Sequence, residues 1–73
     1  MLFGAHPATV ANVRPIDIHG TRMYDVVYQL DGENEPRSAR LGIESLYGEP
    51  SAGDRVVVHL LMNVATRIEQ AAQ

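Results

Sequence analysis

The chain has 73 residues, enough for one small domain. It contains no cysteine, which excludes disulfide bonds, thiolate metal sites and cysteine nucleophiles. Six basic side chains, all arginines spread along the chain, stand against nine acidic ones, so the net charge is −3. Nucleic-acid binding is disfavoured, because it depends on clustered positive charge. A domain of this size is marginally stable, so we expect a closed β-fold or a partner subunit to support it.

The first ten residues, MLFGAHPATV, do not have the composition of a secretory signal. They lack a basic segment, and Gly4, His6 and Pro7 interrupt their apolar run. The longest apolar stretch of the chain, residues 56–62, contains His59 and is too short to cross a bilayer. We therefore expect a cytoplasmic protein that does not contact a membrane.

Strand patterns dominate the first half of the chain. ATVANVR (8–14) is rich in β-branched residues and ends before Pro15. IDIHGTR (16–22) contains Asp17, His19 and Gly20, and this composition predicts a turn or an excursion of the chain. In YDVVYQL (24–30), large apolar side chains at the even positions alternate with the residues between them, as in a strand with one buried face.

The middle of the chain predicts a hairpin followed by a helical turn. A loop that begins at Asp31-Gly32 precedes PRSARLG (36–42), which is expected to be the returning strand. IESLYG (43–48) then predicts one short helical turn near residues 43–47. Helical spacing would bring its large side chains onto one face to fill an open end of a barrel, namely Ile43, Leu46 and Tyr47.

The last third of the chain predicts two more strands. RVVVHL (55–60) has the strongest strand pattern. Met62-Asn63 is expected to turn the chain, and VATRIE (64–69) is expected to be the last strand. The polar EQAAQ tail is compatible with a short C-terminal helix. Five short strands indicate an all-β fold in a single domain over residues 1–73. We expect a small antiparallel barrel, OB-like or SH3-like, because closure removes exposed sheet edges.

No residue pattern in the chain indicates catalysis. The histidines His6, His19 and His59 match no recognised metal-ligand spacing, so we interpret them as separate histidines at or near the surface. No serine lies in a nucleophile elbow, and the carboxylates Glu33 and Glu35 fall in the hairpin loop, where solvation is their simpler role. We therefore expect no enzymatic activity and assign no cofactor and no metal site.

The strand RVVVHLL offers a candidate surface for another protein. Strict alternation places the even-numbered residues of 56–60 on the core face and points Val57, His59 and Leu61 outward. Met62 either caps the barrel end or joins this surface, where methionine would adapt to a partner. We predict that the partner-binding residues are Val57, His59, Leu61 and Met62, with the identity of the partner left open. A histidine in this position would also make an interface sensitive to pH.

Two alternative functions remain. A nucleic-acid-binding barrel would stack bases on tyrosines and hold phosphates with arginines, using Tyr24, Tyr28, Arg37 and Arg40. The simpler role of both tyrosines is core packing, because the chain has one Phe and no Trp. A structural homo-oligomer would associate through an edge strand or through residues 60–62.

The stretch GDRVVVHLLMNVATRIE (53–69) resembles the last two strands of the HypC/HupF family of hydrogenase-maturation chaperones. That family typically reads G-D-x-V-x-V-H, then a turn of small apolar residues, then a strand ending in Ile-Asp or Ile-Glu. The N-terminal MLFGAHPATV also has the family's outline, with Pro7 before the first strand, but Leu2 stands where the family has a cysteine. The residues that meet the C-terminal pattern are Gly53, Asp54, Val56, Val58, His59, Ile68 and Glu69.

The resemblance implies a small barrel with a C-terminal helix. It implies binding to a hydrogenase large-subunit precursor and to the protein that assembles the iron–cyanide–carbonyl group, with a functional role for His59. Thiolate ligation of iron is impossible in a chain without cysteine. The expected function is therefore that of a non-catalytic, protein-binding barrel that acts as an accessory or assembly factor.

Overall fold

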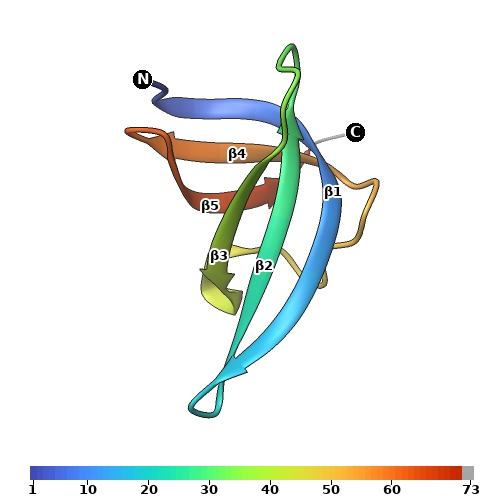
Figure 1. The fold of residues 1–73 in the computed structure, drawn as a ribbon, viewed down its shortest axis with the longest axis vertical. Helices are drawn as coiled ribbons and strands as arrows, with labels where there is room; N and C mark the ends of the chain where they lie inside the picture. The colour runs from blue at the N-terminus through green and yellow to red at the C-terminus, as the bar shows by residue number, and fades with distance from the viewer. Residues whose placement is uncertain (72–73) are drawn as a thin grey trace.

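The computed structural model describes residues 1–71 and contains one five-stranded antiparallel sheet (Figure 1). The elements are β1 (Gly4–Ile18), β2 (Thr21–Leu30), β3 (Arg37–Gly42), the 3-10 turn η1 (Ile43–Ser45), β4 (Arg55–Leu61) and β5 (Val64–Gln70). The strand order is β3-β2-β1-β4-β5, so β1 and β4 are the only neighbours in this sheet that are not consecutive in the chain. The predicted all-β fold with five antiparallel strands and a short helical turn is confirmed.

β1 belongs to both halves of the sheet because it bends. From Gly4 to Thr9 it pairs with β4, and from Ala8 to Ile18 it pairs with β2. A bulge after Val10 interrupts the ladder with β2, and bulges increase the bend and twist of a strand. β4 and β5 consequently run across β2 and β3 (Figure 1). The sheet coils into an open barrel, whose edge strands β3 and β5 touch without forming a ladder within residues 1–71.

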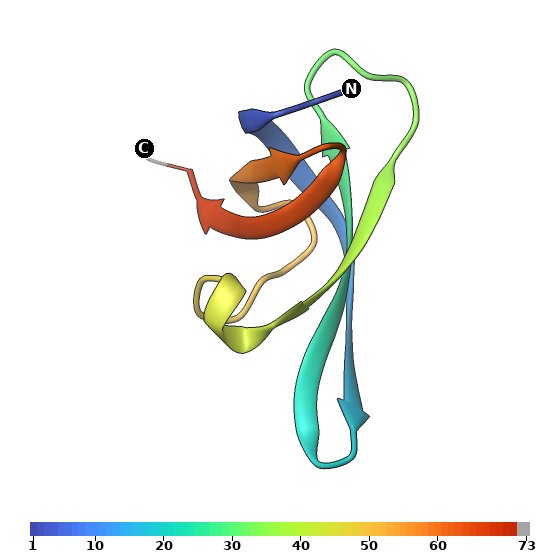
Figure 2. The same cartoon turned by 90° about the vertical axis from the view of Figure 1, so that its left-hand side faces the viewer.

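Residues 16–22 are not the separate turn that their composition predicted, but the tip of a long β1–β2 hairpin (Figure 2). β1 continues through Pro15 to Ile18, and the chain turns at His19 and Gly20, with φ of 50° and 82°. Beyond Thr9, β1 pairs with β2 alone among the described strands, so Pro15 removes no bond to a second strand. Polar residues fit this tip because its side chains are mostly exposed.

The hydrophobic core lies between the two halves of the coiled sheet. The even-numbered residues of β4 point into it, as alternation predicted, and Tyr28 is buried there with 1% of its surface exposed. The core residues are Ala8, Val10, Val26, Tyr28, Leu30, Leu41, Val56, Val58, Leu60, Ala65 and Ile68. Most of these side chains are small, which is consistent with the marginal stability expected of so short a chain.

The helical turn packs differently from the prediction. η1 ends at Ser45, and Leu46 already has an extended backbone, with φ −124° and ψ 173°. Leu46 and Tyr47 pack against the core, whereas Ile43 is 61% exposed. The prediction that Ile43 fills an open end of the barrel is therefore wrong, because the helical spacing that would align Ile43 with Leu46 is not maintained.

The C-terminal tail continues the sheet. β5 extends to Gln70, and Ala71 donates its N–H to the carbonyl of Arg55 at 3.0 Å. The short C-terminal helix considered for this tail is therefore not formed through residue 71, and residues 72–73 lie outside the described residues. No helix within residues 1–71 has the length and hydropathy that crossing a membrane requires.

Gly53 and Asp54 fix the turn that leads into β4. The Asp54 carboxylate accepts hydrogen bonds from the Tyr47 hydroxyl at 2.7 Å and from the Ser51 N–H at 3.0 Å. Burial, together with the bond to Asp54, raises the pKa of Tyr47, so its hydroxyl remains a donor. Gly53 donates its N–H to the Val10 carbonyl at 2.7 Å, and Val10 donates to the Asp54 carbonyl at 2.9 Å. The turn thereby fastens the start of β4 to the bend of β1.

Replacing Asp54 with alanine is expected to destabilise the fold more than replacing Tyr47 with phenylalanine. Asp54→Ala removes two hydrogen bonds and Tyr47→Phe removes one. We expect the free energy of unfolding to fall by about 2 and about 1 kcal/mol respectively, measured by urea denaturation. The exposed Glu35→Gln serves as the control and should change little. Unfolding free energies that match the unmodified chain for both variants would show that the turn is held by its main chain alone.

Candidate protein-binding surface

The predicted binding residues lie on the outer side of β4 and in the turn that follows it. Val57 is half-buried, the side chain of His59 is 30% exposed, and Leu61 is 56% exposed. Met62 is also 56% exposed, so it joins this surface and does not cap the barrel end. The structure thus places Val57, His59 and Leu61 on one face, with Met62 next to them along the chain.

His59 is held by two residues of β5. Its Nε2 lies 3.1 Å from Glu69 Oε1 and 3.5 Å from a terminal guanidinium nitrogen of Arg67. Arg67 lies directly opposite His59 in the β4–β5 ladder, and Arg67 and Glu69 also form an ion pair. One ring nitrogen serves both contacts, so it either donates to Glu69 or accepts from Arg67. We name His59, Arg67 and Glu69 the histidine cluster.

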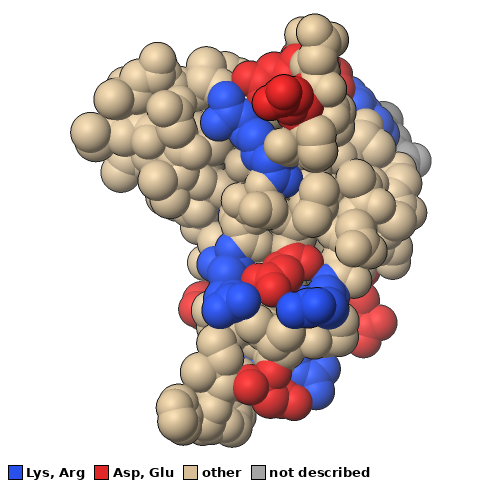
Figure 3. Space-filling view, in the orientation of Figure 1, with Lys and Arg blue, Asp and Glu red and all other residues tan. Residues whose placement is uncertain are grey.

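Apolar side chains extend this surface beyond the predicted residues. Leu61 pairs with Val64 across the β4–β5 ladder, and Gly4 pairs with Leu60, which brings the start of the chain alongside this turn. We name the resulting group the apolar end. Each of its residues is at least 55% exposed. Its members are Met1, Phe3, Leu61, Met62 and Val64. Figure 3 shows no charged residue at its upper left, where Figure 1 places the N-terminus and the β4–β5 turn.

Asn63 ties the start of the chain to this turn. Its side-chain Oδ1 accepts a hydrogen bond from the Leu2 N–H at 2.6 Å, and its own N–H donates to the Leu2 carbonyl at 3.0 Å. Leu2 itself is half-buried and packs against the core. The main chain on either side of Leu2 is therefore fixed, and Met1 and Phe3 are presented beside the β4–β5 turn.

The β4–β5 turn holds Met62 in an unfavourable conformation. Met62 and Asn63 have φ of 52° and 70°, as in the two-residue turns that favour Asn-Gly or Gly-Gly. Asn63 suits this geometry, whereas a methionine in the left-handed region costs about 1–2 kcal/mol. The local conformation therefore does not favour methionine at this position.

Sequence reasoning missed three members of the apolar end, namely Met1, Phe3 and Val64. β1 begins at Gly4 and not at residue 8, so the first residues were not assigned to a strand. Extending alternation backwards from Ala8, which is buried, places Phe3 on the outer side with His59 and Leu61. That pattern is present in the sequence, but Gly4 and Pro7 obscure it.

The residues that carry the family resemblance have separable roles in this structure. Gly53 and Asp54 build the turn before β4, and the valines of the pattern, together with Ile68, are core residues. His59 and Glu69 lie outside the core and contact each other. The surface part of the pattern is therefore His59 and Glu69, two of the three residues of the histidine cluster.

The nucleic-acid alternative does not assemble into one surface. Tyr28 is 1% exposed, so it does not present a ring for stacking, and burial raises its pKa. Tyr24 also packs against the core. Arg37 lies opposite Tyr28 in the β2–β3 ladder and Arg40 lies opposite Asp25, so the two arginines point to opposite faces.

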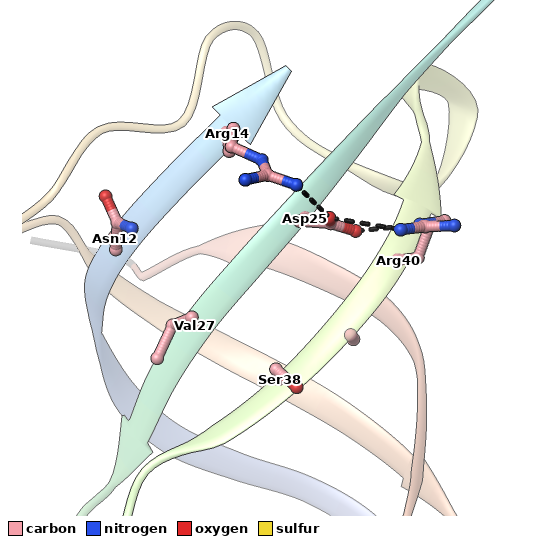
Figure 4. Close-up of a pocket in the computed structure, with 7 residues that line it drawn as sticks. Asn12, Arg14, Asp25, Val27, Ser38 and Arg40 are labelled. Carbon is pink, nitrogen blue, oxygen red and sulfur yellow. Dashed lines mark hydrogen bonds and ion pairs between the residues drawn. The ribbon is translucent and has the colours of Figure 1, made fainter. Parts of the chain in front are cut away.

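Every arginine of the chain is already paired with a carboxylate. On the outer face of β1–β3, Arg40 contacts Asp25 at 2.8 and 3.2 Å, and Arg14 approaches the same carboxylate at 3.9 Å (Figure 4). Asn12 and Ser38 complete this shallow pocket. The pairs are Arg14 and Arg40 with Asp25, Arg22 with Asp17, Arg37 with Glu33, Arg55 with Asp31, and Arg67 with Glu69. A phosphate would have to displace these carboxylates.

The three histidines lie apart. His6 Nε2 is 2.8 Å from the Phe3 carbonyl oxygen, His19 is in the β1–β2 turn, and His59 belongs to the histidine cluster. No group of three or more His, Cys, Asp or Glu side chains within residues 1–71 is arranged to hold a metal ion.

Comparisons of the chain with protein-family models, curated proteins and solved structures gave no match. The candidate surface therefore rests on the residues of this chain alone.

Acid is expected to destabilise the protein through its surface ion pairs. Hydrogen bonds from arginines lower the folded-state pKa of Asp25, Asp31 and Glu33. Such groups stabilise the fold above their unfolded-state pKa, and this contribution is lost as the pH falls through the lower folded-state pKa. We expect the melting temperature, followed by circular dichroism, to fall below about pH 4.

Arg55→Gln provides the control for this acid effect. Arg55 contacts both carboxylate oxygens of Asp31 at 2.8 Å. The variant should therefore lose less stability than the unmodified chain between neutral and acidic pH. A melting temperature that does not change with acidification would show that these exposed pairs contribute nothing to stability.

Proposed function

We propose that this protein is a small, non-catalytic binding protein that acts in the cytoplasm as an accessory or assembly factor for another protein. The observation that carries the proposal is the apolar end, which lies beside the histidine cluster on the outer side of β4. Exposed apolar groups with a polar border are a common feature of protein-binding sites. The arrangement offers hydrophobic contact and, next to it, a group with directional hydrogen bonds.

The residues of this surface have different roles in the proposal. Leu61 and Met62 supply apolar contact, and the flexible methionine adapts its shape to the partner. His59 supplies a ring whose orientation Arg67 and Glu69 already restrict.

The resemblance to the HypC/HupF chaperones supports an assembly role. In that resemblance His59 matches the family's functional histidine, and His59 lies next to Leu61 on the outer side of β4. Leu2 replaces the cysteine and has no thiol, so this chain would guide a protein partner without ligating iron through sulfur. A hydrogenase large-subunit precursor is therefore the first partner to test.

The proposal predicts that single changes on this surface abolish partner binding. A chain tagged at its C-terminus is used for affinity purification from its native host, and any partner is then purified and titrated against it by calorimetry. Leu61→Asp should weaken binding at least about tenfold, because a charge replaces an apolar contact in a desolvated centre. His59→Ala should weaken binding less, because it removes one directional contact and no large apolar one.

Ile43→Asp is the matched control, because Ile43 is an exposed apolar residue of similar exposure on η1. It should bind the partner as the unmodified chain does. A partner that binds Leu61→Asp and His59→Ala with unchanged affinity would refute the proposed surface. Recovery of no stoichiometric partner, including the hydrogenase precursor, would count against the function itself.

A further inference from the structure

We propose that a second copy of this chain covers the apolar end when no other partner is present, forming a two-fold dimer. This inference goes beyond the proposed function, since it concerns the purified protein alone. It also implies that self-association and partner binding compete, because both use Leu61 and Met62.

The area of the apolar end fits a small dimer interface. Its side chains are 55–77% exposed. At roughly 150–200 Å² for a fully exposed side chain of this size, the apolar end presents roughly 450–600 Å² of accessible surface. Two such ends facing each other bury roughly 900–1,200 Å² in total, which reaches the lower limit of about 1,000 Å² for a specific interface.

Charge favours contact through this end of the molecule. Each copy has a net charge of −3, so two copies repel one another over most approaches. The side chains of the apolar end are all uncharged, and the α-amino group of Met1 is the one charge that its five residues carry. The Leu2 N–H and carbonyl already bond to the side-chain Oδ1 and the main-chain N–H of Asn63, so covering them leaves these groups satisfied.

Two residue choices support an interface at this position. Phe3 is the one phenylalanine of a chain that has no tryptophan, yet it is 55% exposed while the core is filled mainly by aliphatic side chains. Aromatic side chains are enriched at the centres of interfaces. Met62 is retained in a left-handed conformation that favours Asn or Gly. Phe3 leaves apolar surface in water and Met62 adopts an unfavourable turn conformation, and an interface would use both side chains.

Two-fold symmetry is the arrangement that suits such a surface. An apolar group is complementary to its own copy, and a two-fold contact uses it once in each copy and then closes. A chain of 73 residues also gains stability from association, since its own core is small.

The test is sedimentation equilibrium of the untagged 73-residue protein, from about 5 to about 500 μM. We expect the mass to rise from one chain towards two across this range. Leu61→Asp should remain at the mass of one chain, and the exposed Ile43→Asp should dimerise as the unmodified chain does. A single-chain mass for the unmodified protein at every concentration would overturn the inference.

Met62→Asn separates loss of the interface from loss of the fold. Asparagine suits the turn, so the melting temperature at low concentration, where the chains are monomeric, should rise. Self-association should nevertheless weaken by about fivefold or more, because an apolar contact is lost. A dimer that both Met62→Asn and Leu61→Asp leave intact, or that Ile43→Asp also disrupts, would place the interface elsewhere.

These outcomes are independent of the proposed function. A protein that stays monomeric but binds another protein through Leu61 overturns the dimer and leaves the function standing. A protein that dimerises through Leu61 but binds no other protein overturns the proposed function and leaves the dimer standing.

Discussion

The bend of β1 at Val10 is the constraint on which the rest of this structure depends. Both main-chain groups of Val10 bond to the Gly53–Asp54 turn, and the bulge that follows lets β1 leave β4 and continue along β2. An unbent sheet of five strands would leave one apolar face in water. Because β1 bends, the two halves of the sheet enclose a mainly aliphatic core. The outer face of β4 is then directed away from the outer face of β2 and β3.

The sequence predicted the strands best where one face is buried. In β4, alternation alone identified the buried side chains and pointed His59 outward, because a strand packed on one side leaves its period of two in the sequence. The same reasoning failed in residues 16–22, where both sides of the projecting hairpin are solvated and no alternation distinguishes a strand from a turn. It failed for Ile43 because η1 is too short to maintain helical spacing.

The candidate surface was predicted in part for a related reason. Val57, His59, Leu61 and Met62 follow one another in the chain, so local pattern was enough to group them. Phe3 reaches the same place because β1 pairs with β4, and pairing between distant segments is not visible in a local pattern. Val64 comes directly after the predicted turn, so its position opposite Leu61 could have been inferred from that hairpin. The sequence also suggested a basic surface from Arg37 and Arg40, but each is paired with a carboxylate: Arg37 with Glu33 in the preceding loop, and Arg40 with Asp25 on the neighbouring strand.

The hydrogen bonds between Leu2 and Asn63 have a consequence for how the chain can be extended. They place Met1 next to the β4–β5 turn, so any residues added before it, as a fusion or an affinity tag, would start directly on the apolar end. Ala71 lies beside Arg55, at the far end of the β4–β5 ladder from that turn. The two chain ends are therefore not equivalent as attachment points: a reporter joined at the front would itself become an occupant of the surface that it was meant to observe.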